Sequence, residues 1–375
     1  MPPKDDARQD YFPALTGLRA VAVFLVLIHH YNPVPPELYG GGLHRLAAET
    51  HIGVTVFFVL SGFLIGYRYL ESRAVSLRTY FANRWARIYP MYFLLTTLTF
   101  GVLYYQNQDT EPFPLGEYLL NITFLRGLFA KYLYTGIAQG WSLTVEEMFY
   151  VSAPLAFGLI RRNGQWLWRL PLLLVALGVG AVLLCRGRPW LGLFDSFGFL
   201  FQFTYLGRAV EFFTGITLAW WLRRSTPGTA QPRFLTYAGV AGSLLCLWGL
   251  SRLHGSEISQ YGVLTPAGMF INNVLLPLCG IGPLLWGLVR EDTWLRRFLS
   301  SPPLLLLGKS SYVFYLIHVG VLYTLLREWL PSPVQAIIVL YGASILLYWA
   351  VEEPLNHWLR RVLRKPVMQV PLLSN

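Results

Sequence analysis

Long apolar runs separated by short polar connections follow one another along most of the chain. About twenty apolar residues make a helix long enough to cross the hydrocarbon core of a bilayer. We therefore predict about ten membrane-spanning helices, with boundaries uncertain by several residues. The predicted spans are 14–32, 51–70, 88–106, 141–160, 168–185, 199–222, 235–252, 264–289, 303–326 and 334–352.

The segment 117–130 breaks this pattern, because its apolar run is shorter and is interrupted by polar side chains. A run of this length is too short to cross the bilayer as a helix. We expect an interfacial or re-entrant helix at this place.

Composition supports a membrane protein. Hydrophobic residues make up 54% of the chain and charged residues only 13%, which leaves too few charges to cover the surface of a soluble domain. Tryptophan and tyrosine gather at the ends of the apolar runs, as they do at membrane interfaces. The predicted fold is an all-α, polytopic helical bundle that forms a single domain over 1–365, followed by a short tail at 366–375.

The formal net charge of +11 comes from basic residues that are scattered between the apolar runs. No basic tract interleaved with aromatic residues appears, so a nucleic-acid partner is not indicated. With the N-terminus inside, the predicted inner loops and C-terminal tail hold about 17 basic residues and the outer loops about 7. We expect both termini in the cytoplasm. The first ten residues are polar with no cleavage site after them, so the first span should stay in the mature protein.

Two residues of the first span suggest chemistry at different depths. Arg19 and His30 are eleven residues apart, which places them on one helix face about 16 Å from each other along the axis. His29 points about 100° away from that face. The spacing therefore pairs His30, and not His29, with Arg19, which leaves His29 as the bystander of the two.

The fourth span carries Ser142 and Glu146 one helical turn apart on the same side. It runs inward while the first span runs outward, so Glu146 and His30 are expected at similar depth. A carboxylate beside an imidazole in a medium of low dielectric favours a basic histidine, as general-base catalysis requires. The alternative is that His30 caps a helix at the interface and Glu146 pairs with an arginine for stability.

Further charged residues within or beside the spans point to a polar interior. Arg208 and Glu211 lie three residues apart and can either pair with each other or bind a ligand. His318 lies far from either end of its span. Arg84 and Arg87 flank the cytoplasmic start of the third span, where they form a candidate phosphate clamp or simply follow the positive-inside bias.

Seven sequence blocks together resemble acyltransferase family 3, a family of integral-membrane acyltransferases, over nearly the whole chain. They occur in the order expected for that family. The blocks are TGLRAVAVFLVLIHH, GVTVFFVLSGFLIG, FANRWARIYPMYF, GWSLTVEEMFY, GRAVEFFTGITLA, LGKSSYVFYLIH and YWAVEEPL.

The resemblance implies transfer of an acyl group, usually acetyl from acetyl-CoA on the cytoplasmic side, to a hydroxyl of a carbohydrate, antibiotic or lipid-linked acceptor. It also implies a bacterial-type cytoplasmic membrane. His30 matches the essential histidine of the family and Arg19 its opening arginine. Ser142 and Glu146 match a serine-x-x-x-glutamate element.

Arg84 and Arg87 match a basic pair thought to lie near the CoA phosphates, while His318 and Glu352 match later family positions. With Arg208 and Glu211, His318 is assigned to the substrate site. Cysteines are few and are spaced unlike metal ligands, so no metal cofactor is expected.

Two positions depart from the family pattern. Thr55 stands where an aspartate is common, so a carboxylate role at that point is in doubt. The proline often found two residues after the later histidine is replaced by Gly320, which predicts a less kinked ninth span.

The resulting mechanism docks CoA from the cytoplasm on Arg84 and Arg87, with Arg19 near its path. Its pantetheine arm reaches His30, which takes the proton of the acceptor hydroxyl. Glu146 orients the imidazole, and Ser142 bonds the glutamate or the developing oxyanion. A covalent acyl-enzyme intermediate remains open. The alternative function is a transporter or exporter of a polar cell-envelope metabolite, and a non-catalytic scaffold is a third.

Overall fold

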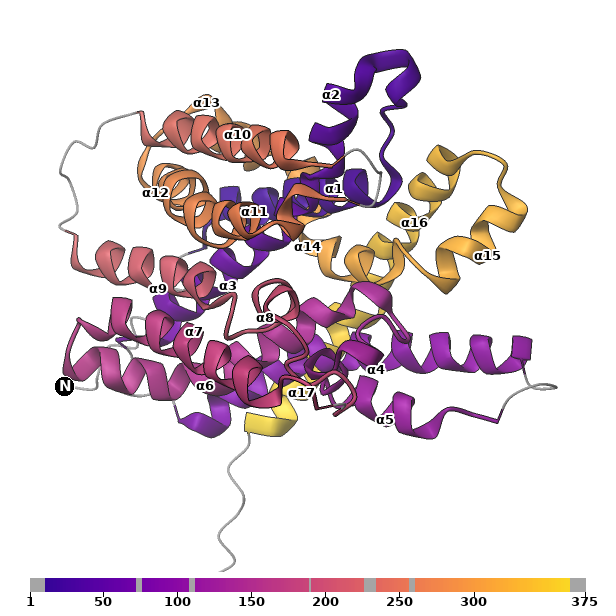
Figure 1. Ribbon diagram of the computed structural model, residues 1–375, viewed down its shortest axis with the longest axis horizontal. Helices are drawn as coiled ribbons and strands as arrows, with labels where there is room; N and C mark the ends of the chain where they lie inside the picture. The colour runs from indigo at the N-terminus through magenta and orange to yellow at the C-terminus, as the bar shows by residue number, and fades with distance from the viewer. Residues whose placement is uncertain are drawn as a thin grey trace, which may run out of the picture. The chain divides into compact units, whose positions relative to one another are not determined.

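A computed structural model describes residues 11–71, 76–107, 112–188, 190–225, 234–255 and 260–364 (Figure 1). Within these ranges the chain is helical and forms no β-strand, apart from one isolated bridge between Phe129 and Leu193. The all-α fold is therefore confirmed. The tail predicted at 366–375 lies outside the described residues.

The chain divides into two compact units. The first comprises 1–64 and 210–312, and the second comprises 65–209 and 313–375. The chain passes from one unit to the other inside α3 (Gly53–Tyr69), at the start of α9 (Ala209–Arg224) and inside α14 (Pro302–Ile317).

Besides its parts of α3, α9 and α14, the first unit is built from helices near the N-terminus and in the second half of the chain. They are α1 (Pro13–Tyr31), α2 (Pro36–Ala48), η1 (Thr50–Ile52), α10 (Leu235–Leu253), η5 (Gly262–Leu264), α11 (Pro266–Phe270), the π-helix η6 (Ile271–Ile281), α12 (Gly282–Arg290) and α13 (Trp294–Leu299).

The second unit contains the middle of the chain and its C-terminal helices. They are α4 (Leu77–Asn107), α5 (Leu115–Ile122), η2 (Arg126–Leu128), η3 (Ala130–Tyr132), η4 (Ala138–Gly140), α6 (Trp141–Arg162), α7 (Trp166–Cys185), α8 (Phe197–Phe203), α15 (Val321–Trp329), α16 (Pro333–Leu347), the π-helix η7 (Tyr348–Glu352) and α17 (Glu353–Arg364).

Glycines set the closest helix crossings of the first unit. A Cβ on Gly17 of α1 would lie 1.9 Å from the carbonyl oxygen of Leu299, and a Cβ on Gly62 of α3 would lie 2.0 Å from that of Phe212 in α9. Small residues are needed wherever membrane helices bring their backbones this close. Elsewhere in this unit, α10 packs along α12 and η6 (Figure 1).

In the second unit a proline inside α6 leaves one backbone carbonyl without its helical hydrogen-bond donor, and a tyrosine side chain replaces that donor. Pro154 has no N–H, so the carbonyl of Tyr150, four residues earlier, lacks its helical donor. The hydroxyl of Tyr80 in α4 donates a hydrogen bond to this carbonyl at 3.0 Å. This bond ties α4 to α6. Helix α4 also packs against α17.

Seven helical segments of the described chain are long and apolar enough to cross a membrane, or eight with a bent pair. Together with the bent pair, these segments correspond to eight of the predicted spans. The span predicted at 199–222 is instead broken into α8 and α9. The span at 235–252 forms α10 but is less apolar than the others. Ten spans and cytoplasmic termini stay predictions. The segment 117–130 forms the short α5 and η2, too short for a crossing.

The expectation of a less kinked ninth span is wrong. Helices α14 and α15 meet at 90°, with the break at residues 318–320. Gly320 adopts φ +95°, a left-handed conformation that glycine reaches without a Cβ clash. The glycine therefore ends α14 and turns the chain more sharply than a proline kink in a continuous helix requires.

Candidate active site

The first span places Arg19 and His30 on one continuous helix, as predicted. Helix α1 runs from Pro13 to Tyr31, and the eleven residues between the two side chains correspond to a rise of about 16 Å. Arg19 is half-buried, whereas His30 is exposed at the end of the helix.

The imidazole of His30 has a defined tautomer. Its Nδ1 lies 3.0 Å from the carbonyl oxygen of Val26, one turn earlier. Because a carbonyl oxygen only accepts hydrogen bonds, Nδ1 carries the proton and donates it. In the neutral ring, Nε2 then holds the lone pair that a general base uses.

His29 is held in the same tautomer by a different partner. Its Nδ1–H donates to the carbonyl oxygen of Ala48 at 2.5 Å. Its ring centre lies 5.1 Å from that of His30, 5.4 Å from that of His51 and 5.0 Å from that of Tyr261. His29 thus lies at the centre of a group of rings.

Glu49 belongs to this group and was not found from the sequence. Its carboxylate is fully buried, and Oε1 accepts hydrogen bonds from His254 Nδ1–H at 2.7 Å and from the Gly262 N–H at 2.5 Å. Its Oε2 lies 3.6 Å from His51 Nδ1. Residues separated by about 200 positions form this group, so sequence spacing gave no signal for it.

In the second unit, Glu146 of α6 is held by Tyr150, one helical turn later. The Tyr150 hydroxyl donates a hydrogen bond to Glu146 Oε1. The guanidinium of Arg84 lies 5.8 Å from the centre of the Tyr150 ring and within electrostatic range of Glu146. The structure therefore brings Arg84 and Glu146 together around Tyr150. The i, i+4 spacing in EEMFY was the available signal for the tyrosine.

Ser142 has buried partners. Its Oγ lies 3.1 Å from the carbonyl oxygen of Gln139 and 2.8 Å from the Tyr315 hydroxyl, which is itself 3.1 Å from the same carbonyl. The two hydroxyl protons serve these three contacts, so one hydroxyl donates to the carbonyl and the other donates to its neighbour. Gln139 Nε2 in turn donates to the carbonyls of Tyr315 and Leu316. This arrangement fixes the start of α6, and a catalytic role for Ser142 stays a prediction.

His318 ends α14 and is completely buried. Its Nδ1–H donates to the Tyr315 carbonyl at 2.8 Å, and its ring stacks on Phe314 with a centroid distance of 5.6 Å. These contacts stabilise the end of α14 just before the 90° break. Its assignment to the substrate site stays a prediction.

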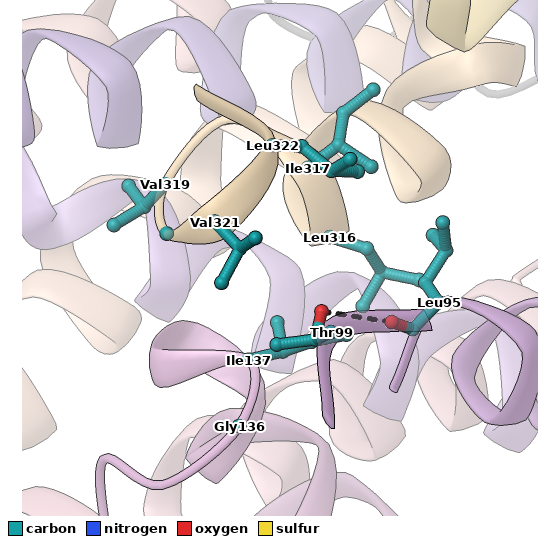
Figure 2. A pocket seen from close by; sticks show the side chains of 10 residues that line it. Leu95, Thr99, Gly136, Ile137, Leu316, Ile317, Val319, Val321 and Leu322 are labelled. Atoms are coloured by element: carbon teal, nitrogen blue, oxygen red, sulfur yellow. Dashed lines mark hydrogen bonds between the residues drawn. The ribbon is translucent and has the colours of Figure 1, made fainter. Parts of the chain in front are cut away.

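A small pocket lies beside this break (Figure 2), with about 240 Å³ of empty space including open solvent. Its one side-chain hydroxyl, that of Thr99, already donates to the Leu95 carbonyl at 2.8 Å. The pocket holds none of the predicted site residues, and the side chains that line it are apolar apart from that of Thr99. Its lining residues are Leu95, Thr99, Gly136, Ile137, Leu316, Ile317, Val319, Gly320, Val321 and Leu322.

Arg84 and Arg87, one turn apart on α4, have different surroundings. Both are half-buried. The Nε–H of Arg84 is shielded from solvent and has no hydrogen-bond partner among the described residues. Arg87 lies within electrostatic range of Tyr348 in η7.

The remaining predicted residues are buried at helix ends and breaks. Arg208 Nη1 donates to the Gln202 carbonyl in the last turn of α8 at 3.1 Å, a favourable place for a cation. Glu211 is fully buried in the part of α9 that belongs to the first unit, so its pairing with Arg208 of the second unit stays a prediction. Glu352 is buried at the end of η7.

Arg126 organises the loop that leads into α6 and was not singled out from the sequence. Its guanidinium is completely buried and donates to the carbonyls of Thr135 and Ile137. Burial lowers the pKa of Arg126 from its ordinary value. The ordinary value is so high that the side chain remains the cation of this loop.

No group of three or more His, Cys, Asp or Glu side chains is placed to hold a metal ion within the described ranges. His30 belongs to the first unit, whereas Ser142, Glu146 and the arginine pair of α4 belong to the second. The catalytic roles toward His30 that the sequence assigns to Glu146 and Ser142 stay predictions.

Comparison with known proteins gives a consistent picture. Residues 12–353 match the model of a family described as an acyltransferase domain. The acyltransferase MdmB of Streptomyces mycarofaciens is 28% identical, over 96% of this chain and 95% of its own length. The peptidoglycan O-acetyltransferase OatA of Listeria monocytogenes is 25% identical over 82% of this chain, and a putative O-acetyltransferase of Staphylococcus aureus is 20% identical over 91%. The chain spans about half the length of these last two relatives, at 49% and 55%. No solved structure matches it.

Proposed function

The chain belongs to the acyltransferase domain family, and we propose that it transfers an acyl group from acyl-CoA to a hydroxyl of a carbohydrate, glycosylated or lipid-linked acceptor. Acetyl is the expected group, and acetyl-CoA the expected donor. Its multiple apolar helices and its family make it an integral multi-pass membrane protein, and we place it in a bacterial-type cytoplasmic membrane.

The observation that carries the proposal is the state of His30. The imidazole lies exposed at the end of a membrane helix with Nδ1–H bound to the Val26 carbonyl, so Nε2 is the unprotonated nitrogen of the neutral ring. In the proposed step, Nε2 takes the proton of the acceptor hydroxyl as the hydroxyl oxygen attacks the thioester carbonyl. The acyl–sulfur bond breaks, the ester bond forms, and the thiolate of CoA leaves and regains a proton.

The donor side of the proposal rests on Arg84 and Arg87. Phosphate groups bind guanidinium donors strongly, and Arg84 has an Nε–H with no partner in the described part of the chain. Arg19 lies on the same helix face as His30, at the other end of the path that the pantetheine arm would follow.

The acceptor side is proposed by analogy with relatives. One relative is named for peptidoglycan O-acetylation, which supports a carbohydrate hydroxyl as the acceptor here as well. An acyltransferase family assignment favours an enzyme over the alternative of an exporter or a scaffold.

The test uses the full-length protein purified into lipid vesicles. It is supplied with acetyl-CoA carrying a labelled acetyl group, and with peptidoglycan fragments or alkyl glycosides as acceptors. We expect a labelled O-acetyl ester and release of free CoA thiol, both absent from vesicles that contain His30→Ala. If acetyl-CoA stays intact with every acceptor, the proposed function is wrong. Thiol release without an ester on these acceptors would contradict the carbohydrate acceptor alone.

A further inference from the structure

Four histidines, one glutamate and one tyrosine of the first unit meet where α1, η1 and the segment after α10 come together. We call this group the histidine cluster. It is built by α1, by the end of α2 with η1, and by the chain between α10 and η5. Its members are His29, His30, Glu49, His51, His254 and Tyr261.

Glu49 anchors the cluster. Its buried carboxylate accepts hydrogen bonds from His254 Nδ1–H and the Gly262 N–H, at 2.7 and 2.5 Å. These bonds fix the backbone around Glu49 to His254 and to Gly262. A buried carboxylate with two donors is costly to disturb, since any lost bond leaves a polar atom without solvent.

The anchored backbone sets the direction of His29. The carbonyl of Ala48, next to Glu49 in the chain, accepts the His29 Nδ1–H at 2.5 Å. A second route leads through Tyr261, whose ring centre lies 5.0 Å from that of His29 and 5.6 Å from that of His254. Both routes connect the position of Glu49 to the His29 ring.

His29 in turn contacts the ring of His30. The two rings meet edge to face, with centres 5.1 Å apart and planes at 66°. His30 is exposed, and an exposed side chain changes rotamer readily unless a neighbour restricts it. The His29 ring therefore restricts the rotamers that the His30 imidazole can adopt.

From these contacts we propose that His29 is a positioning residue for His30 and that Glu49 holds His29 in place. This inference rests on the proposed function of His30. It departs from the bystander role that spacing predicts for His29, because the contacts that matter come from η1 and the α10–η5 segment rather than from the face of α1.

The kinetic test measures acetyl transfer from acetyl-CoA to peptidoglycan fragments or alkyl glycosides by the full-length protein in vesicles. His29→Ala and Glu49→Ala should each lower kcat by about 10- to 100-fold, because small losses of orientation are costly to proton transfer. KM for acetyl-CoA should stay within about twofold, since the cluster orients the base without holding the donor. An unchanged kcat in His29→Ala overturns the proposal.

A double variant tests whether the two residues act along one route. His29→Ala combined with Glu49→Ala should be no more than about threefold slower than the slower single variant, because effects through a shared partner do not add. If the fold losses in kcat of the two single variants multiply in the double variant, Glu49 acts on kcat by a route that does not pass through His29. If Glu49→Ala does not fold, Tyr261→Leu replaces it, since that variant removes the second route without removing a buried hydrogen bond.

Two variants separate this role from a general loss of structure. Glu49→Gln keeps an oxygen that can accept from Gly262, so its kcat should stay within about threefold of the wild type. Glu291 is a matched control in the same unit. Its buried carboxylate accepts from the Leu235 and Thr236 N–H groups and from the Thr236 hydroxyl. Glu291→Ala should lower Tm and leave kcat unchanged, and an equal loss of kcat there would overturn the proposal.

A measurement without turnover distinguishes failure of this inference from failure of the proposed function. The chain has seven histidines, and their ring carbons can be labelled for NMR in micelles. The His30 signal is identified by its loss in His30→Gln. Glu49→Ala should move this signal by more than its line width, and Glu291→Ala should not. An unmoved His30 signal overturns the inference even in an active enzyme. A moved signal in a protein that transfers no acyl group contradicts the proposed function alone.

Discussion

The Tyr150 hydroxyl donates a hydrogen bond to the carboxylate of Glu146, one turn earlier on α6. The same tyrosine lies under the Arg84 guanidinium, and its own carbonyl accepts from Tyr80 because Pro154 cannot donate to it. The carbonyl that the proline leaves without a helical donor and the hydroxyl that binds the candidate catalytic carboxylate therefore belong to one residue.

Removing that hydroxyl tests the role of Glu146. Tyr150→Phe keeps the ring beneath Arg84 and deletes the bond to the carboxylate, so kcat for acetyl transfer should fall about tenfold. Steady-state kinetics with acetyl-CoA measures the change. Tyr205→Phe is the control, because Tyr205 is also buried in the second unit and accepts from Ser152. Equal losses in both variants would assign Tyr150 a packing role only.

The loss of the His30 imidazole should remove proton transfer. His30→Ala should lower kcat at least about 100-fold while the protein still inserts and folds, since the ring is exposed at the end of α1. Initial rates and the thermal unfolding of the purified variant are the measurements. Near-normal turnover in a folded His30→Ala protein would rule out His30 as the base.

Charge removal at the arginine pair should weaken donor binding rather than chemistry. Arg84→Gln and Arg87→Gln should each raise KM for acetyl-CoA by about tenfold, with kcat changed much less. Raised salt should reduce the difference from the wild type. Arg78→Gln serves as the control, because Arg78 is exposed at the start of the same helix. Unchanged KM values would remove the phosphate-clamp role.

The crossing of α3 and α9 should tolerate no added methyl group. Gly62→Ala would place its Cβ 2.0 Å from the Phe212 carbonyl oxygen, so we expect a loss of about 1–3 kcal/mol in the free energy of unfolding. Gly101→Ala is the contrasting variant. No atom lies within 4 Å of a Cβ at Gly101 in α4, and alanine favours a helix over glycine by up to about 1 kcal/mol. Chemical denaturation in micelles should show that Gly62→Ala lowers the free energy of unfolding and that Gly101→Ala raises it.

Most of the fold could be predicted from local sequence patterns. Apolar length alone located the seven helical segments of the described chain that are long enough for a membrane, and the bent pair α14 and α15. The spacing of Arg19 and His30 held because α1 is continuous. The break between α8 and α9 was missed because the overall apolar length of 199–222 outweighed the polar residues at the break, Thr204 and Arg208. The bend at Gly320 was missed because hydropathy does not report backbone conformation.

The candidate site was predictable only where its residues share a helix. Glu146 and Ser142 follow from their spacing on α6, and the bond of Glu146 to Tyr150 uses the same spacing. The pair of Glu49 and His254 joins distant parts of the chain, so no local pattern contains it. Arg126 gave no signal either, because a lone arginine in a short interfacial segment is expected to reach solvent.

Arg126 has a consequence for how this protein can change over generations. Its guanidinium holds the loop before α6 by donating hydrogen bonds to the backbone carbonyl oxygens of residues 135 and 137, and every amino acid has such an oxygen. These two bonds survive any substitution at residues 135 and 137. The Thr135 hydroxyl, which also accepts from Asn121 and donates to the Tyr132 carbonyl, and the buried Ile137 side chain add contacts that a substitution would lose. A single buried cation therefore supplies the part of the loop's stability that mutation of the accepting positions leaves in place.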